Sequence, residues 1–172
     1  AWHAMLRNGQ ETVLGPNDLP VTLRRSVDAQ QANPRLLGIY RYDEDRADWT
    51  YVGGRMDGHA GEMAVTVTRS GTYAVMAYNK TYRDMPSSHW AFDAIQLLSA
   101  RHIVRGTPDG AFSPNGITTR AEFAMMLART LGAQASGPAP FRDVPAAAWY
   151  ADAVAAMYDT GIIQGRGAAA FA

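Results

Sequence analysis

The chain has 172 residues, and its 16 lysines and arginines balance 16 aspartates and glutamates, so it carries no net charge. This length suits one ordinary domain or two small ones. The balanced charge argues against nucleic-acid binding, and no apolar run approaches the ~20 residues that span a bilayer, so no membrane insertion is expected. The absence of cysteine excludes disulfides, thiolate chemistry and the usual structural zinc sites, and it fits a secreted bacterial protein without excluding a cytosolic one.

Short extended runs separated by turn signals characterise residues 1–80. In RLLGIYRY, Leu37 and Ile39 share one face, and Tyr40 and Tyr42 share the other. This period of two, with many β-branched and aromatic residues, predicts an antiparallel, β-sandwich-like module. The other predicted strands lie within 12–27, 48–54 and 62–78.

The last of these runs, EMAVTVTRSGTYAVMAY, has Ser70-Gly71 between two extended stretches, which predicts a hairpin. The number of strands is low for a closed sandwich. We therefore expect further strands upstream of residue 1, and the module over 1–80 to be incomplete.

Two features of the β half suggest binding. The acids of YDEDRADW (42–49) would suit a calcium ion, although a solvated hairpin tip is the simpler explanation. Trp49 and Tyr51, two residues apart, share a strand face, which would suit a carbohydrate if both are exposed. The four histidines show no metal-ligand spacing, so we predict neither a metal nor a cofactor.

After Tyr82 the pattern becomes helical. In SSHWAFDAIQLLSARHI (87–103), Ser88 is the candidate N-cap of a first helix. The segment 132–140 ends a second helix with glycine and proline, and AAAWYADAVAAMYDTGII (146–163) predicts a third. The expected apolar stripe of the first helix consists of Trp90, Ala94, Leu97 and Leu98.

The second helix is predicted from Arg120 to Leu131. Thr119 and Glu122 match the T-x-x-E capping box, a structural role. Arg120 lies in the first turn, where the helix dipole disfavours a cation by roughly 0.3–1 kcal/mol. This position suggests a function for Arg120, with a solvated ion pair as the alternative. The stripe expected to be buried consists of Phe123, Met126, Leu127, Thr130 and Leu131.

The helical half repeats itself with a shift of 59 residues, since 82–113 lies on 141–172 without a gap. We expect each unit to be a helix, a glycine-punctuated loop and a second helix, and the units to pack on each other. The second copy ends before its counterpart of ITTRAEF, so uncovered stripes should pair with another chain, the β module or a further segment. Matching pairs include Asp84/Asp143, Trp90/Trp149, Gly106/Gly165 and Phe112/Phe171.

The order YRD, HWA, AI, GTPDGAFSP, ITTRAEFA resembles the S-layer homology domain of bacterial surface proteins. The resemblance divides the helical half into repeat 1 (81–133), a linker (134–140) and a truncated repeat 2 (141–172), which reads GRGAAAFA where repeat 1 reads GTPDGAFS. More loosely, the β half resembles modules that precede such repeats in secreted surface enzymes of Paenibacillus- and Bacillus-type Gram-positive bacteria.

What the resemblance implies is non-covalent anchoring to the cell wall. Such domains usually occur in threes around a pseudo-threefold axis, and grooves between repeats hold a secondary cell-wall polysaccharide that often bears a pyruvate ketal. Arg120 would bind the carboxylate, and a helix start beside a guanidinium suits an anion. Trp90 and Trp149 would line the groove, although core packing explains both equally well. The loop would contribute Gly106, Asp109 and Gly110.

Asp84 and Asp143 each precede a proline and a helix start, which favours a turn or capping role over ligand binding. Catalysis has no support, because the sequence lacks a G-x-S-x-G motif, a phosphate loop and a Cys/His pair. The first residues, AWHAMLRNGQ, look like neither a signal peptide nor a natural start, so we interpret the chain as a fragment of a longer secreted protein. The alternative to a dedicated anchor is the tail of a cell-surface polysaccharide hydrolase or lyase whose catalytic domain lies upstream.

Overall fold

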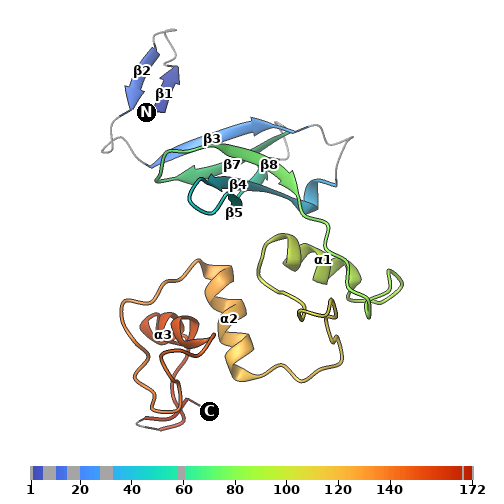
Figure 1. Cartoon of the computed structure of the whole chain (residues 1–172), viewed down its shortest axis with the longest axis vertical. Helices are drawn as coiled ribbons and strands as arrows, with labels where there is room; N and C mark the ends of the chain where they lie inside the picture. Colours follow the sequence, from blue (N-terminus) through green and yellow to red (C-terminus); the bar gives the residue numbers. More distant parts are fainter. Residues whose placement is uncertain are drawn as a thin grey trace. The chain divides into compact units, whose positions relative to one another are not determined.

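The computed structural model describes residues 2–5, 11–14, 20–27, 33–57, 61–167 and 169–171. The chain divides into two compact units, Ala1–Lys80 and Thr81–Ala172 (Figure 1). Among these residues, the first unit contains β-strands and a short 3-10 helix, and the second contains three α-helices. The predicted α+β class is therefore confirmed.

The strands of the first unit pair antiparallel throughout. The first two form a separate pair, and the other six form two three-stranded sheets of order β3-β7-β6 and β5-β4-β8. A 3-10 helix, η2 (Pro34–Leu36), leads into β4. The strands are β1 (Trp2–Met5), β2 (Glu11–Leu14), β3 (Val21–Ser26), β4 (Leu37–Asp43), β5 (Asp48–Gly53), β6 (Arg55–Asp57), β7 (Glu62–Val67) and β8 (Tyr73–Ala77).

One apolar cluster joins the two three-stranded sheets. Leu37 and Ile39 of β4 are buried with Met63 of β7, which has no exposed surface. The alternation predicted for RLLGIYRY is thus confirmed, since the two tyrosines face the other side of β4. A β-sandwich, however, is not confirmed by the described strands.

The hairpin predicted at Ser70-Gly71 is wrong. The strands on either side of it, β7 and β8, belong to different sheets. Both edges of β7 are already occupied, by β3 and by β6, so its backbone has no free edge for β8. The chain instead crosses to the second sheet, where β8 pairs with β4.

Two of the three helices that the structure describes in the second unit are shorter than the sequence suggested, whereas α2 has the predicted span from Arg120 to Leu131. The three helices are α1 (Phe92–Ala100), α2 (Arg120–Leu131) and α3 (Ala151–Asp159). The helix start predicted at Ser88 is wrong. Tight turns precede the helix, in which the His89 N–H donates to the Pro86 carbonyl and the Phe92 N–H donates to the His89 carbonyl, and the N-cap of α1 is Ala91. Trp90 consequently precedes the helix and is not part of its apolar stripe.

The buried face of α2 also differs from the prediction. Phe123 and Leu131 are 52% and 55% exposed, whereas Ala124 and Ala128 are buried against α3. On the α3 side the cluster contains Ala153, Ala156 and the fully buried Met157. Leu127 of the predicted stripe packs against this cluster and is partly buried, so the prediction holds for Leu127 and fails for Phe123 and Leu131.

The second helix of repeat 1 packs on the helix of repeat 2. One apolar cluster combines α2 with α3, Phe141 and Phe171, and a separate cluster in repeat 1 contains Tyr82 and Ile95. The repeats therefore do not form two self-contained helix-loop-helix units. In packing terms, α2 completes the core of the repeat that follows it.

Candidate functional site

The start of α2 is a fully formed capping box. The Glu122 N–H donates to Thr119 Oγ1 at 3.2 Å, and the Thr119 N–H donates to Glu122 Oε2 at 2.7 Å. These two bonds satisfy donors that a helix start would otherwise leave without partners. The geometry fixes the first turn, and with it the position of Arg120.

Arg120 extends from this first turn to the second repeat. Its Nη2 donates a hydrogen bond to the Gln164 carbonyl, and its guanidinium carbon lies 4.8 Å from the centroid of the buried Phe171 ring. The carbonyl and the ring face are both electron-rich, so they offset the unfavourable helix dipole. The bond to Gln164 uses only one side of a group with five N–H donors.

The other end of α2 is tied to the first repeat. Arg129 Nη1 donates to the Ile103 carbonyl at 3.1 Å, in the segment that follows α1. The contact of Arg120 with Gln164 lies in the corresponding segment after α3. Helix α2 thus links the two post-helix segments through an arginine at each end.

The glycine loop of repeat 1 is held by the segment that precedes α1. Asp109 forms an ion pair with Arg83, and the Arg83 N–H donates to the Gly110 carbonyl at 3.0 Å. A Cβ on Gly106 would collide with the Tyr82 ring and the Ala111 carbonyl, so only glycine fits there. Hydrogen bonds from Thr107 and Arg83 hold the pKa of Asp109 below its ordinary value.

Each repeat closes its loop with an aspartate. Both Asp84 carboxylate oxygens accept backbone N–H groups, from Phe112 and Ser113, at 2.7 Å each. These bonds lower the pKa of Asp84. In repeat 2, Asp143 accepts the N–H of Phe171 at 2.8 Å. The two aspartates therefore join segments 28 residues apart in sequence, a longer-range role than the turn or cap that sequence suggested.

The two tryptophans are exposed. Trp90 is 90% and Trp149 is 62% accessible, and each contacts the neighbouring aromatic ring, of His89 and Tyr150. Core packing, one of the two interpretations left open by the sequence, does not hold for either side chain. Both rings are available for a ligand or for a protein surface.

The predicted site residues do not gather in one place. Trp90, Gly106, Asp109 and Gly110 all belong to repeat 1, whereas Arg120 contacts the loop of repeat 2. Sequence reasoning missed the partners Gln164 and Phe171. The 59-residue repeat could have indicated Phe171 as the counterpart of Phe112, but nothing local connects either residue to Arg120.

His102 lies near two arginines of repeat 1, Arg105 and Arg129. Burial lowers the pKa of His102, and the charges of Arg105 and Arg129 lower it further. His102 directly follows Arg101, the C-cap residue of α1, and its backbone is left-handed, with φ of 55°. At neutral pH this group therefore adds an uncharged ring beside two cations.

Residues 81–124 and 140–172 match the S-layer homology domain. The C-terminal half of the chain belongs to the S-layer homology family. The two matched stretches correspond to the two copies of the internal repeat, and the S-layer homology repeats include the capping box, Arg120, and both glycine loops.

Several curated proteins share these repeats. The chain is 35% identical over 161 residues to an amylopullulanase of Thermoanaerobacterium thermosulfurigenes, covering 93% of this chain and 8% of that enzyme. It is 47% identical over 90 residues to endo-1,4-beta-xylanase A of Thermoanaerobacterium saccharolyticum, covering 51% and 8%. It is 34% identical over 110 residues to the S-layer protein sap of Bacillus anthracis, covering 63% and 13%.

The chain thus spans about a tenth of the length of these relatives. No solved structure matches it. Among the described residues, no helix has the length and apolar character needed to cross a membrane. The S-layer homology repeats and the S-layer proteins among the relatives identify the chain as part of a secreted, cell-wall-associated protein.

Proposed function

We propose that the S-layer homology repeats attach a secreted protein non-covalently to the bacterial cell wall by binding a pyruvylated secondary cell-wall polysaccharide. The observation that carries this proposal is the position of Arg120, at the amino end of α2 and against the loop of the next repeat. A ligand at this point would contact both repeats at once.

The chemistry of this place suits a carboxylate. Arg120 is half-buried, which reduces screening by water, and its planar guanidinium has donors beyond the one bonded to Gln164. The glycines of the two loops allow close backbone approach, and Trp149 is exposed on the same repeat as Gln164. Binding at several such grooves along a polymer would add avidity to a weak single contact.

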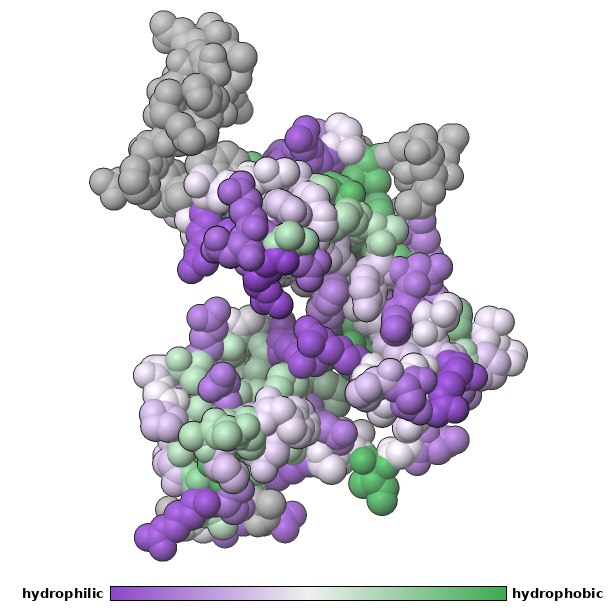
Figure 2. All heavy atoms as spheres, viewed as in Figure 1, coloured by the Kyte–Doolittle hydropathy of each residue, from purple (hydrophilic) through white to green (hydrophobic). Residues whose placement is uncertain are grey.

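The exposed apolar side chains suggest where further repeats would pack. Apolar residues reach the surface at several places (Figure 2), and Ile117 is 94% exposed. In repeat 2 the face of α3 is covered by α2, whereas Ala94 on the same face of α1 is exposed. We infer that the second helix of another repeat covers α1, in the manner in which α2 covers α3.

The test is co-sedimentation of the full chain with purified cell-wall sacculi, before and after removal of the secondary polymer. We expect binding that depends on the polymer, that falls at least tenfold in Arg120→Ala, and that is unchanged in Arg142→Ala, which removes an exposed arginine elsewhere in repeat 2. Arg120→Lys keeps the charge without the planar fork and should bind with intermediate strength. Equal binding to stripped sacculi would contradict the proposal.

A second proposal concerns the parent protein. The match to the amylopullulanase extends over 93% of the chain and so includes the β unit as well as the repeats. This favours a polysaccharide-degrading enzyme as the parent, with this chain as its anchoring tail. The full reading frame should then encode a glycoside hydrolase or lyase domain, and a reading frame with only β modules and repeats would contradict it.

A further inference from the structure

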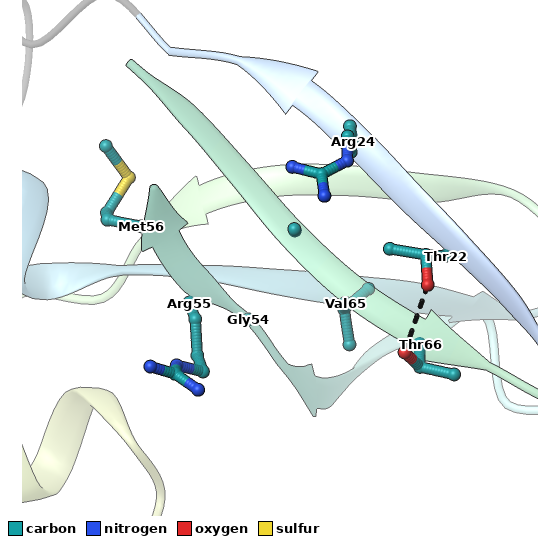
Figure 3. Close-up of a pocket in the computed structure, with 8 residues that line it drawn as sticks. Thr22, Arg24, Gly54, Arg55, Met56, Val65 and Thr66 are labelled. Atoms are coloured by element: carbon teal, nitrogen blue, oxygen red, sulfur yellow. Dashed lines mark hydrogen bonds between the residues drawn. The ribbon is translucent and has the colours of Figure 1, made fainter. Parts of the chain in front are cut away.

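The two three-stranded sheets of the first unit differ in their outer faces, which point away from the apolar cluster that joins them. On the β3-β7-β6 sheet the outer face carries polar side chains, among them Thr22, Arg24 and Thr66 (Figure 3). The hydroxyls of the two threonines are 3.3 Å apart. A polar outer face is usual for an antiparallel sheet that packs on one side only. The β5-β4-β8 sheet departs from this rule, because its outer face is aromatic.

Four aromatic side chains form this face, in two cross-strand pairs. Tyr40 of β4 pairs with Tyr51 of β5, and the ring centroids are 5.4 Å apart. Tyr42 pairs with Trp49, with centroids 5.2 Å apart. Ile39, the neighbour of Tyr40, belongs to the apolar cluster on the inner side. Because side chains alternate along a strand and paired residues share a face, all four rings lie on the outer side.

Small residues beside the rings keep this face low. A Cβ on Gly38 would lie 2.5 Å from Cε2 of Tyr51 and 3.4 Å from Cε2 of Tyr40. Glycine at this position therefore lets the two rings lie against the backbone of β4. On β8 the residue paired with Tyr40 is Ala74, which adds only a methyl group to the same face. The aromatic surface is thus not enclosed by larger side chains of β8 at this position.

The pair nearer the β4–β5 turn keeps polar groups for a ligand. Tyr42 and Trp49 are both partly exposed. In the part of the chain that the structure describes, neither the Trp49 indole N–H nor the Tyr42 hydroxyl has a hydrogen-bond partner. Each side chain therefore offers an apolar ring and an unused polar group. A sugar ring is the complement of such a surface, since it has an apolar C–H face and hydroxyl groups at its edge.

The turn between β4 and β5 decides which kind of sugar fits. Residues 43–48 read DEDRAD and carry more acidic than basic groups. Asp43 Oδ1 accepts the N–H groups of Asp45 and Arg46, at 3.1 and 3.2 Å, which fixes the turn next to the pair of Tyr42 and Trp49. Carboxylates accept hydrogen bonds from sugar hydroxyls and repel an anionic polymer. The charge beside these rings therefore favours a neutral sugar chain over an acidic one.

We propose that the outer face of the β5-β4-β8 sheet binds a neutral polysaccharide chain, with Trp49 and Tyr51 under successive parts of the chain and the Tyr42 hydroxyl bonded to a sugar hydroxyl. Trp49 and Tyr51 are two residues apart, about 7 Å along β5, so the face extends in the direction of a chain. The cell wall, with which this secreted protein is associated, is rich in polysaccharide. The β unit is then a second glycan-binding surface, opposite in charge preference to Arg120.

The test is titration of the 15N-labelled full chain with three neutral oligosaccharides, maltohexaose, cellohexaose and xylohexaose, and with the acidic chain hexagalacturonate. The readout is the indole N–H signal of Trp49, which is identified by its loss in Trp49→Phe. We expect at least one neutral chain to shift this signal saturably, in the millimolar range, whereas the acidic chain does not shift it. The neutral chain that binds most tightly identifies the sugar.

Three variants, followed through the Tyr51 amide, locate the binding face. Trp49→Ala removes a ring and should weaken binding at least tenfold. Tyr42→Phe keeps the ring and its packing, removes only the hydroxyl, and should weaken binding about fivefold. Thr50→Ala lies between the two rings of β5 but on the opposite face, and should leave binding unchanged. Unchanged amide signals of Ile39 would show that each variant keeps the fold of the β unit.

The proposal is overturned if none of the three neutral chains shifts the Trp49 signal, if hexagalacturonate shifts it equally, or if Thr50→Ala weakens binding as much as Trp49→Ala. A Trp49 signal that moves when the chain is diluted without sugar would show that a second copy covers this face, which also overturns the proposal. Cell-wall co-sedimentation through Arg120 is measured separately and on the other unit, so either result can fail while the other stands.

Discussion

The two S-layer homology repeats share a local design, yet their helices differ in burial. In α3, Ala153 and Met157 are buried beneath α2. Their counterparts in α1, Ala94 and Leu98, are exposed and half-buried. The same sequence pattern thus gives a covered helix in one repeat and an open helix in the other, because only repeat 2 follows a signature helix. The burial of a repeat helix is decided by the neighbouring repeat.

The loops behave in the opposite way, since each is built by its own repeat. Gly106 in repeat 1 and Gly165 in repeat 2 are both enclosed by an aromatic ring and a backbone carbonyl. The contact between the ring that encloses the loop glycine and the end of the repeat helix differs between the repeats, being a hydrogen bond in repeat 1 and a ring contact in repeat 2. Tyr82 bonds Ser99 through its hydroxyl at 2.8 Å, and in repeat 2 the corresponding pair, Phe141 and Tyr158, makes an edge contact with centroids 5.4 Å apart.

The largest effect on stability is expected at the loop glycines, which are enclosed in the same way in both repeats. A Cβ on Gly165 would lie 2.6 Å from both the Ala170 carbonyl oxygen and the Phe141 ring, and the contacts at Gly106 are of the same kind. Gly106→Ala and Gly165→Ala should each reduce the free energy of unfolding by about 3 kcal/mol, measured by urea denaturation. Gly137→Ala, with open space around it, should change the free energy by less than ~0.5 kcal/mol. Tolerance of either loop variant would show that the repeats do not share this loop constraint.

A smaller effect should separate the two helices. Ala153→Leu inserts a larger side chain beneath α2 and should cost about 2 kcal/mol, because the contact is already close-packed. Ala94→Leu makes the same change on the exposed face of α1 and should stay within ~0.5 kcal/mol. The same denaturation measurement checks both. Equal costs would mean that α1 is as well covered in solution as α3.

The smallest expected effect is on the stability of the chain at low pH, through Asp84. The pKa of Asp84 is lowered because its carboxylate accepts the N–H groups of Phe112 and Ser113. Its contribution to stability is therefore complete above the ordinary aspartate pKa of about 3.9 and is lost as pH falls through the lower folded value. Asp84→Asn should flatten the fall of the urea midpoint below about pH 4. A midpoint that falls as steeply as in the parent chain would assign the acid sensitivity to other groups.

Prediction from sequence succeeded where the signal is local. The capping box at Thr119 and Glu122 needs only a four-residue spacing and a helix start, and the alternation of Leu37 and Ile39 needs only a strand with one buried face. Prediction failed where the structure of a segment depends on which distant segment it pairs with. Ser70-Gly71 has the sequence of a hairpin turn, but β7 pairs with β3 and β6, and β8 pairs with β4.

The candidate site shows the same division. The unfavourable dipole at Arg120 was visible in the sequence, and it correctly indicated that something must stabilise the cation. The stabilising groups, Gln164 and Phe171, lie more than forty residues further along the chain, and Gln164 follows Arg120 by 44 residues. The exposure of Trp90 was equally hidden, since it follows from tight turns that end just before α1.

The sequence by itself determined the two-part organisation, the repeat, the family and the span of α2, because repetition, periodicity and capping are properties of neighbouring residues. Only the tertiary structure decided that α2 packs on α3 through Ala124 and Ala128, and that β8 pairs with β4 and not with β7. Both depend on which segments meet and in what register. That choice is made by close packing and backbone pairing between segments far apart in the chain, which no local pattern specifies.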